Sequence, residues 1–240
     1  TPKFSRQSVA LFEEGVDTVA INNNSILFWR DKARSYDNII NDTVQAFNST
    51  TQFPGMVPAG QGIEFVKRQT PIPFFLGLRY ISPAPFSDRD VQLYRYSNGA
   101  LYLIQDSKID ALNKIISFYV RDLNDPIIPL IDTLPPTIAV LSDTTSIWQP
   151  NIANADSLNI SDNIANPQVL HFYCKGDTVI DEARSDKSVI SNGSIIVLDI
   201  PASVITTTAG VRASIEVSDG RNSKMVNTSR RVYRAQSDEG

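Results

Sequence analysis

The amino-acid sequence predicts a mainly β fold of two tandem antiparallel β-sandwich modules, the first carrying one helix and a long segment rich in proline and aromatic residues. Three observations lead to this prediction. Short runs of alternating apolar residues recur along most of the chain, and turn-forming residues separate them. Similar strand-like stretches follow Ser97-Asn98-Gly99 and Ser191-Asn192-Gly193, which indicates a duplicated structural unit.

Composition places the chain among globular proteins that are large enough for two domains. Of its 240 residues, 42% are hydrophobic and 20% are charged, and the formal net charge is -4. This balance, with no stripe of basic residues, argues against nucleic acid as a partner. Cys174 is the only cysteine, so an internal disulfide is excluded. Apolar runs are too short for a transmembrane helix, and we expect neither a signal peptide nor a membrane partner.

The N-terminal module is expected to span residues 1–134 and to contain one helix near residues 32–48. Five apolar or aromatic residues recur there at three- and four-residue steps: Ala33, Tyr36, Ile40, Val44 and Phe47. Because an α-helix repeats about every 3.6 residues, this spacing places all five side chains on one helical face.

A β-hairpin is the clearest local prediction in the same module. Apolar residues alternate from Val91 into Asn98-Gly99, and Leu101 and Leu103 continue the alternation after the turn. An Asn-Gly pair favours a type I′ turn, because both of its residues tolerate positive φ. A further strand is predicted over residues 115–122.

Residues 53–86 are rich in proline and aromatic residues, and we expect them to form an extended arm. The prolines exclude a regular helix, yet the segment is too apolar for a free linker. It either packs over its own module as a long ordered loop or docks against another subunit. The candidate interface residues are apolar side chains along the arm: Phe53, Met56, Phe65, Phe74, Phe75, Tyr80 and Phe86.

The C-terminal module is expected to span residues 137–240, after Pro135-Pro136, and to fold as a β-sandwich. Its predicted strands lie at 137–141, 158–161, 169–174, 195–200, 211–217 and 225–233. Pro201 ends the fourth of these strands, because proline cannot donate a ladder hydrogen bond. Asp219-Gly220 predicts a short hairpin between the last two strands.

Residues with catalytic or metal-binding chemistry are sparse. The only histidine, His171, lies on a predicted strand with Cys174, and alternation puts their side chains on opposite faces. This geometry excludes a Cys-His nucleophile, and one His with one Cys cannot complete a zinc site. Asp88 and Asp90 are interpreted as turn-capping acids, and Gly60-Gln61-Gly62 lacks the lysine of a phosphate loop. We therefore expect no catalytic residue, cofactor or metal, and no enzyme activity.

The C-terminal module also carries a resemblance to a known family. A strand over residues 195–200 is followed by Ala209-Gly210 and a second strand over 211–217, which ends near Asp219-Gly220. This pattern resembles the immunoglobulin-like modules of tailed-phage structural proteins, especially the N-terminal domain of baseplate upper proteins. Part of the first module shares the pattern, whereas residues 53–86 depart from it.

The resemblance implies a non-enzymatic structural or assembly protein of a phage virion, in the head, tail or baseplate, that acts through protein–protein interfaces. Its partners would be other copies of itself and/or other virion proteins, in an oligomer within the virion. The alternative is a bacterial cell-surface β-sandwich module that binds carbohydrate or a host protein, located extracellularly or on the cell surface, with exposed Trp148 or tyrosine residues lining a groove. A hydrolase with two acids paired in space is a third hypothesis.

Overall fold

The computed structural model describes the backbone of residues 7–11, 17–21, 24–29, 40–47, 52–65, 74–120, 124–142, 147–148, 154–176, 182–184, 188–189, 191–193, 195–200 and 211–232. Side chains are described at residues 46–47, 52–65, 75–120, 124–142, 157–167, 191–193, 195 and 215–226. This part of the chain is mainly β, with antiparallel sheets and one short 3-10 helix, η1 (Asp88–Asp90). The mainly β prediction is therefore confirmed. No helix within the described ranges is long and apolar enough to cross a membrane.

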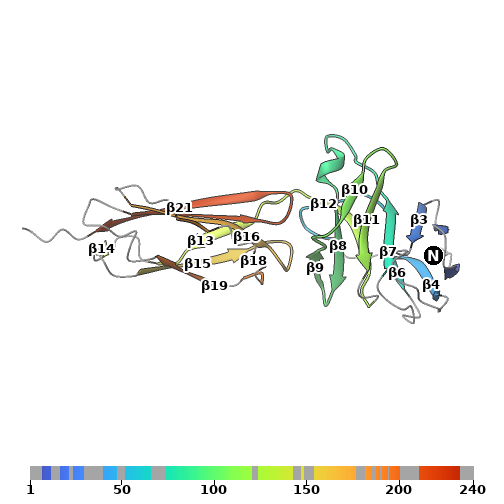
Figure 1. The fold of residues 1–240 in the computed structure, drawn as a ribbon, viewed down its shortest axis with the longest axis horizontal. Helices are drawn as coiled ribbons and strands as arrows, with labels where there is room; N and C mark the ends of the chain where they lie inside the picture. Colours follow the sequence, from blue (N-terminus) through green and yellow to red (C-terminus); the bar gives the residue numbers. More distant parts are fainter. Residues whose placement is uncertain are drawn as a thin grey trace, which may run out of the picture. The chain divides into compact units, whose positions relative to one another are not determined.

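The chain divides into two compact units, Thr1–Thr133 and Leu134–Gly240 (Figure 1). The described strands of the first unit form two sheets. A seven-stranded sheet has the order β1-β4-β6-β12-β8-β9, and β5 also pairs with β12. Its strands are β1 (Gln7–Leu11), β4 (Ile40–Phe47), β5 (Met56–Pro58), β6 (Gly62–Phe65), β8 (Gln92–Ser97), β9 (Ala100–Leu103) and β12 (Ile127–Asp132). A five-stranded sheet has the order β10-β11-β7-β3-β2, with β2 (Asp17–Ile21), β3 (Asn24–Trp29), β7 (Phe74–Arg79), β10 (Lys108–Asp110) and β11 (Ile115–Val120).

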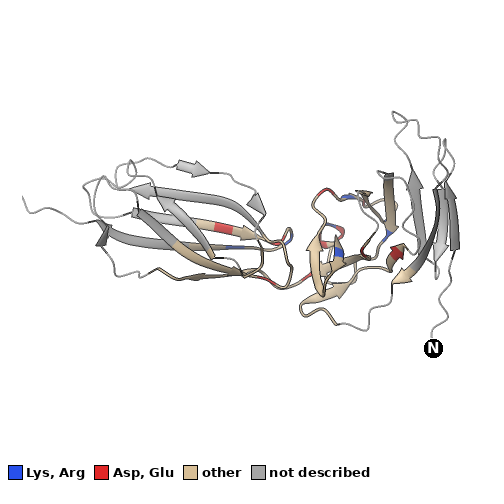
Figure 2. Ribbon diagram, turned by 90° about the horizontal axis from the view of Figure 1, so that it is seen from below, with Lys and Arg blue, Asp and Glu red and all other residues tan. Residues whose placement is uncertain are grey.

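Both sheets of the first unit contribute to one hydrophobic core. Leu76 in β7 and Ile116 in β11 meet there with Ile127 and Ile131 of β12. Successive side chains of a strand point to opposite faces, so Ile128 of β12 lies on the outer face of the seven-stranded sheet. That residue is nevertheless buried, because other parts of the unit cover this outer face as well. Most of the charged positions that the structure describes in the first unit lie in loops and at strand ends (Figure 2).

The second unit also contains two sheets among its described strands. The three-stranded sheet β13-β15-β19 consists of β13 (Thr137–Val140), β15 (Asn154–Ser161) and β19 (Ile195–Ile200). The six-stranded sheet consists of β14 (Ile147–Trp148), β16 (Gln168–Gly176), β17 (Glu182–Arg184), β18 (Ser188–Val189), β20 (Val211–Ser218) and β21 (Ser223–Val232). Leu158 and Ile160 of β15 share a core with Ile215 and Val217 of β20. The short β14–β21 pair is parallel, an exception to the antiparallel prediction.

The helix predicted near residues 32–48 is wrong over residues 40–47, which form β4; residues 32–39 lie outside the described residues. This strand pairs with β1 on one edge and with β6 on the other, so that Val44 is opposite both Gln7 and Phe65. Ile40, Thr43 and Val44 are β-branched, which suits a strand. Pairing with strands distant in the sequence outweighs the helical spacing.

Residues 53–86 are not a single extended arm, because β5, β6 and part of the five-stranded sheet arise within them. In particular, β6 lies between β4 and β12, and β7 lies between β3 and β11. Pro54 precedes β5 and Pro58 ends it, so these two prolines stand where a ladder hydrogen bond is not required. The segment is therefore a structural part of both sheets.

The two Ser-Asn-Gly sequences have different structures, although the similar stretches that follow them indicate a duplicated structural unit. Asn98 (φ 49°) and Gly99 (φ 83°) form the predicted hairpin between β8 and β9, where Ser97 pairs with Ala100. Asn192, in contrast, lies between β18, which pairs with β16, and β19, which pairs with β15. The second sequence is thus a connection between two sheets. Asn192 Oδ1 accepts a hydrogen bond from the backbone N–H of Asp162 at 2.9 Å.

Candidate interaction site

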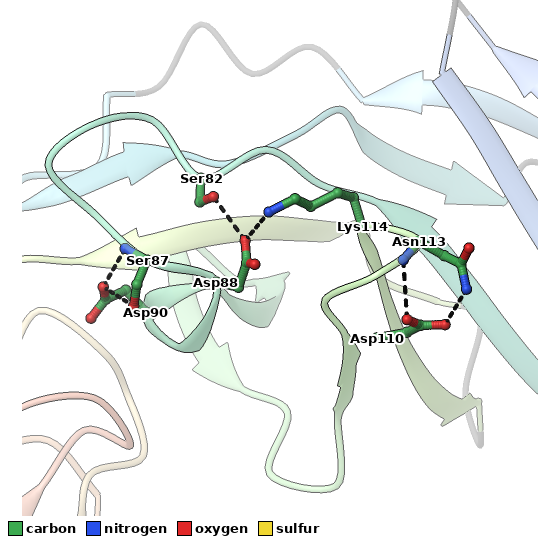
Figure 3. Close-up of polar contacts among 7 residues, drawn as sticks. All are labelled: Ser82, Ser87, Asp88, Asp90, Asp110, Asn113 and Lys114. Carbon is green, nitrogen blue, oxygen red and sulfur yellow. Dashed lines mark hydrogen bonds and ion pairs between the residues drawn. The ribbon is translucent and has the colours of Figure 1, made fainter.

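The turn of residues 111–114, between β10 and β11, carries the most exposed large hydrophobic side chain in the described part of the chain. Leu112 is 90% exposed. The backbone N–H of Asn113 donates to Asp110 Oδ1 at 3.1 Å, and Asn113 Nδ2 donates to Asp110 Oδ2 at 2.7 Å (Figure 3). These two hydrogen bonds lower the pKa of Asp110. The carboxylate therefore fixes the turn that holds Leu112.

A polar cluster of Tyr80, Ser82, Asp88 and Lys114, here called the Asp88 clasp, anchors the same turn. Asp88 Oδ1 accepts hydrogen bonds from Lys114 Nζ at 2.5 Å and from Ser82 Oγ at 2.8 Å (Figure 3). The backbone N–H of Tyr80 donates to the Lys114 carbonyl at 3.0 Å. The hydrogen bonds from Lys114 and Ser82 lower the pKa of Asp88. Three segments, the end of β7, helix η1 and the turn, are thereby tied together.

The ring of Tyr80 connects the Asp88 clasp to the hydrophobic core. Its side chain belongs to the hydrophobic core of the first unit, and Lys114 Nζ lies 5.7 Å from the centroid of its ring. Burial and the negative charge of Asp88 raise the pKa of Tyr80 to about 12. A general base works best with a pKa near the operating pH, so this phenol is poorly suited to that role at neutral pH. The geometry indicates a structural clasp.

Ile81 and Leu112 lie close in the sequence to residues of the Asp88 clasp. Ile81 is 62% exposed and lies between Tyr80 and Ser82, whereas Leu112 precedes Lys114 by two residues. Ordering a mobile loop on binding costs free energy. Because the clasp already fixes the backbone beside both side chains, this cost is lowered. The two residues are therefore exposed apolar side chains on backbone that hydrogen bonds already hold.

A separate pocket, here called the outer pocket, opens on the first unit with a volume of about 550 Å³. Its lining combines β12 residues on the outer face of the seven-stranded sheet with residues of β4, β5, β6 and the loops beside them. The lining residues are Phe47, Gln52, Phe53, Met56, Pro58, Gly60, Gln61, Gly62, Ile128 and Leu130.

The predicted interface residues fall into different environments. Phe53 and Met56 are half-buried and line the outer pocket. Phe65 and Tyr80 are buried in the core, with 4% and 3% of their surface exposed, so their side chains serve packing within the unit. Phe86 is half-buried against that core, and Phe75 packs edge-on to Tyr119 with ring centroids 4.8 Å apart. The Phe74 side chain lies outside the described residues.

Sequence reasoning did not identify Leu112, Ile81 or Lys114. An isolated apolar residue in a predicted turn is common on protein surfaces and gives no signal of its own. Asp88 and Asp90 were interpreted as turn-capping acids, and Asp90 does accept hydrogen bonds from the backbone N–H and Oγ of Ser87 at 2.7 and 2.8 Å. The pairing of Asp88 with Lys114 joins residues 26 positions apart, which only the tertiary structure reveals.

The second unit contains a pair of acidic side chains at one end. One carboxylate oxygen of Asp162 lies within 4.8 Å of one of Asp219. Asp219 Oδ1 accepts hydrogen bonds from the backbone N–H groups of Arg221 and Asn222 at 2.7 and 2.6 Å. Burial raises the pKa of Asp219, and its hydrogen bonds with Asn222 partly offset that effect.

The backbone of β16 places His171 opposite Glu216 and Cys174 opposite Ala213, with a β-bulge between Val169 and His171. The side chains of His171 and Cys174 lie outside the described residues, as does that of Trp148. Comparison of the sequence with known protein families and with curated proteins finds no match.

Proposed function

We propose that this chain is a non-enzymatic structural and assembly protein of a phage virion, a component of the head, tail or baseplate. It binds other copies of itself and/or other virion proteins. The observation that carries the proposal is the turn of residues 111–114, which holds Leu112 at 90% exposure while hydrogen bonds fix the backbone around it.

An exposed leucine on a fixed turn is suited to a protein interface for a physical reason. Complete burial of a leucine side chain stabilises a contact by roughly 1.5–3 kcal/mol. Interfaces concentrate their binding free energy in a few well-packed residues of this kind. Since the Asp88 clasp orders the turn before any partner arrives, little of the gain is offset by lost conformational entropy.

The β framework is consistent with the same role. Each unit has its own hydrophobic core, to which two sheets contribute, so each unit is a compact domain. We interpret the two units as tandem immunoglobulin-like sandwiches, the module type that the sequence of residues 195–220 resembles. Such modules would space the contact points along an oligomeric assembly.

The test combines self-association in solution with incorporation into particles. Sedimentation velocity of the full chain from low to high micromolar concentration measures self-association, and mass spectrometry of purified phage particles measures incorporation. Leu112→Ser is expected to weaken association about tenfold or more, because truncation of an interface hot spot costs about 2 kcal/mol or more. Ile195→Ser is the matched control, since Ile195 is also exposed, at 63%, but belongs to the second unit.

The proposal is supported if Leu112→Ser weakens assembly and Ile195→Ser does not. A wild-type chain that stays monomeric at every concentration and is absent from purified particles would overturn it. Equal effects of the two substitutions would also contradict the assignment of Leu112 as the contact point.

A further inference from the structure

The outer pocket has a buried apolar floor. Ile128 and Leu130 alternate along β12 with the core residues Ile127 and Ile131, and only 7% and 3% of their surfaces are exposed. Gly62 lies beside them, and a Cβ atom there would come within 3.2 Å of Ile128 Cγ1. The glycine therefore leaves no side chain of its own in the space above the floor.

The walls of the outer pocket are held in place by contacts within the unit. The ring of Tyr96 lies 5.9 Å from that of Phe47 and 5.2 Å from that of Phe53, between ring centroids. The Phe53–Met56 turn is closed by the Met56 N–H, which donates to the Phe53 carbonyl at 3.1 Å. Thr133 fixes that turn further, because its N–H and Oγ1 both donate to the Gly55 carbonyl. The pocket is thus formed before any ligand binds.

Gln61 supplies an oriented polar group. Its Nε2 donates to the Phe47 carbonyl at 3.0 Å and to the Gly62 carbonyl at 3.2 Å. An amide NH₂ group has two hydrogens, so both are used, and Oε1 is the hydrogen-bonding atom that the side chain can still offer to a ligand. The pocket therefore provides a fixed acceptor, which selects a ligand that carries an N–H or O–H donor.

Among the lining residues that the structure describes, none ionises near neutral pH. Burying a charged group without a partner is strongly unfavourable, so this environment selects an uncharged ligand. Pockets that bind small molecules are mostly apolar, with a few placed polar groups and volumes of roughly 300–1,000 Å³. The outer pocket, at about 550 Å³, falls within that range.

We propose that the outer pocket binds a small, neutral aromatic molecule of two or three rings, whose N–H or O–H group donates to Gln61 Oε1. The rings lie on Ile128 and Leu130, between Phe47 and Phe53. This proposal is independent of the assembly function, because the exposed Leu112 turn does not line the pocket.

The experiment uses the full chain and two matched probes, N-phenylnaphthylamine and benzylnaphthalene, which differ by an N–H against a CH₂ group. Fluorescence titration measures the binding of N-phenylnaphthylamine. The affinity of benzylnaphthalene is measured by its ability to displace that first probe. We expect saturable binding of one probe per chain, with the N–H probe bound about two- to tenfold more tightly, the usual effect of one hydrogen bond. Gln61→Leu should remove this preference. Phe53→Ala should lower the binding affinity of both probes about tenfold.

Tyr102→Ala is the matched control, because Tyr102 is also a half-buried aromatic residue of the first unit but does not line the pocket. Unchanged binding in this variant supports the assignment. Absence of saturable binding to the wild-type chain overturns the proposal, as does equal weakening by Phe53→Ala and Tyr102→Ala. Equal affinity of the two probes for the wild-type chain refutes the role of Gln61 even if Gln61→Leu does not fold.

Discussion

Two aspartates of this protein have pKa values shifted in opposite directions. Hydrogen bonds from Lys114 and Ser82 lower the pKa of Asp88, so the folded chain favours the carboxylate there. Burial raises the pKa of Asp219, so the folded chain favours the protonated acid at that position. Protonation is linked to folding, and the two residues should therefore respond to pH with opposite signs.

The stabilising contribution of Asp88 is present above its unfolded-state pKa and is lost as the pH falls through its lower folded-state value. Asp88→Asn should therefore destabilise the first unit at neutral pH, and this difference should shrink in acid. The contribution of Asp219 is present below its unfolded-state pKa and is lost as the pH rises through its higher folded-state value. Asp219→Asn should therefore gain stability relative to the wild-type chain between acidic and neutral pH.

Urea denaturation at a series of pH values, with each unit followed by pulsed hydrogen exchange at one labelling pH, measures both effects. Each variant is the control for the other, because its substitution lies in the other unit. Parallel pH dependences of the two variants would contradict the assignment of opposite shifts.

At the scale of elements, two glycines of the first unit are required for different reasons. A Cβ atom on Gly60 would lie 2.8 Å from Pro129 Cγ and 2.9 Å from the Arg79 carbonyl oxygen. Gly99, in the β8–β9 hairpin, has a φ of 83°, and a Cβ atom added there would have nothing within 4 Å. Close packing thus disfavours a side chain at position 60, whereas at position 99 only the backbone conformation does so.

Gly60→Ala is expected to destabilise the first unit by about 1–3 kcal/mol, through overpacking against backbone that cannot shift cheaply. Gly99→Ala should cost about 1–2 kcal/mol, the usual penalty for a left-handed residue with a Cβ atom. Asparagine separates the two causes, because it tolerates the left-handed region. Denaturation curves should show Gly99→Asn recovering stability relative to Gly99→Ala, while Gly60→Asn is worse than Gly60→Ala. The reverse order would show that the causes are misassigned.

At the scale of the whole molecule, the two separate cores predict where a core substitution acts. Ile215 is 1% exposed and packs with Leu158, Ile160 and Val217 in the second unit. Ile215→Ala should destabilise that unit by about 2–5 kcal/mol, through lost burial and the cavity left behind. Hydrogen-exchange mass spectrometry should show lower protection in β15 and β20 while β7 and β11 are unaffected.

Ile116→Ala is the matched control for that experiment. Ile116 is fully buried in the core of the first unit, so its substitution should produce the opposite pattern of protection. Equal loss of protection in both units after either substitution would contradict the separation of the cores.

The sequence by itself determined the mainly β class, the Asn98-Gly99 hairpin and strands such as Ile195–Ile200, where predicted and observed bounds agree. These features depend on local physics: alternation sets which faces of a strand are apolar, and positive φ is inexpensive for asparagine and glycine. The proline- and aromatic-rich composition of residues 53–86 also indicates Phe53 and Met56 as candidate interface residues. It does not predict the pocket that these two residues line.

Only the tertiary structure decided that residues 40–47 form a strand, that residues 53–86 enter both sheets, and that Asn192 connects two sheets. The same holds for the Asp88 clasp and the outer pocket. Each of these features joins residues that are far apart in the sequence, as when Met56 pairs with Asp132. A local pattern cannot specify which distant strand satisfies its backbone hydrogen bonds, and that choice sets both the element type and the residues that meet at a site.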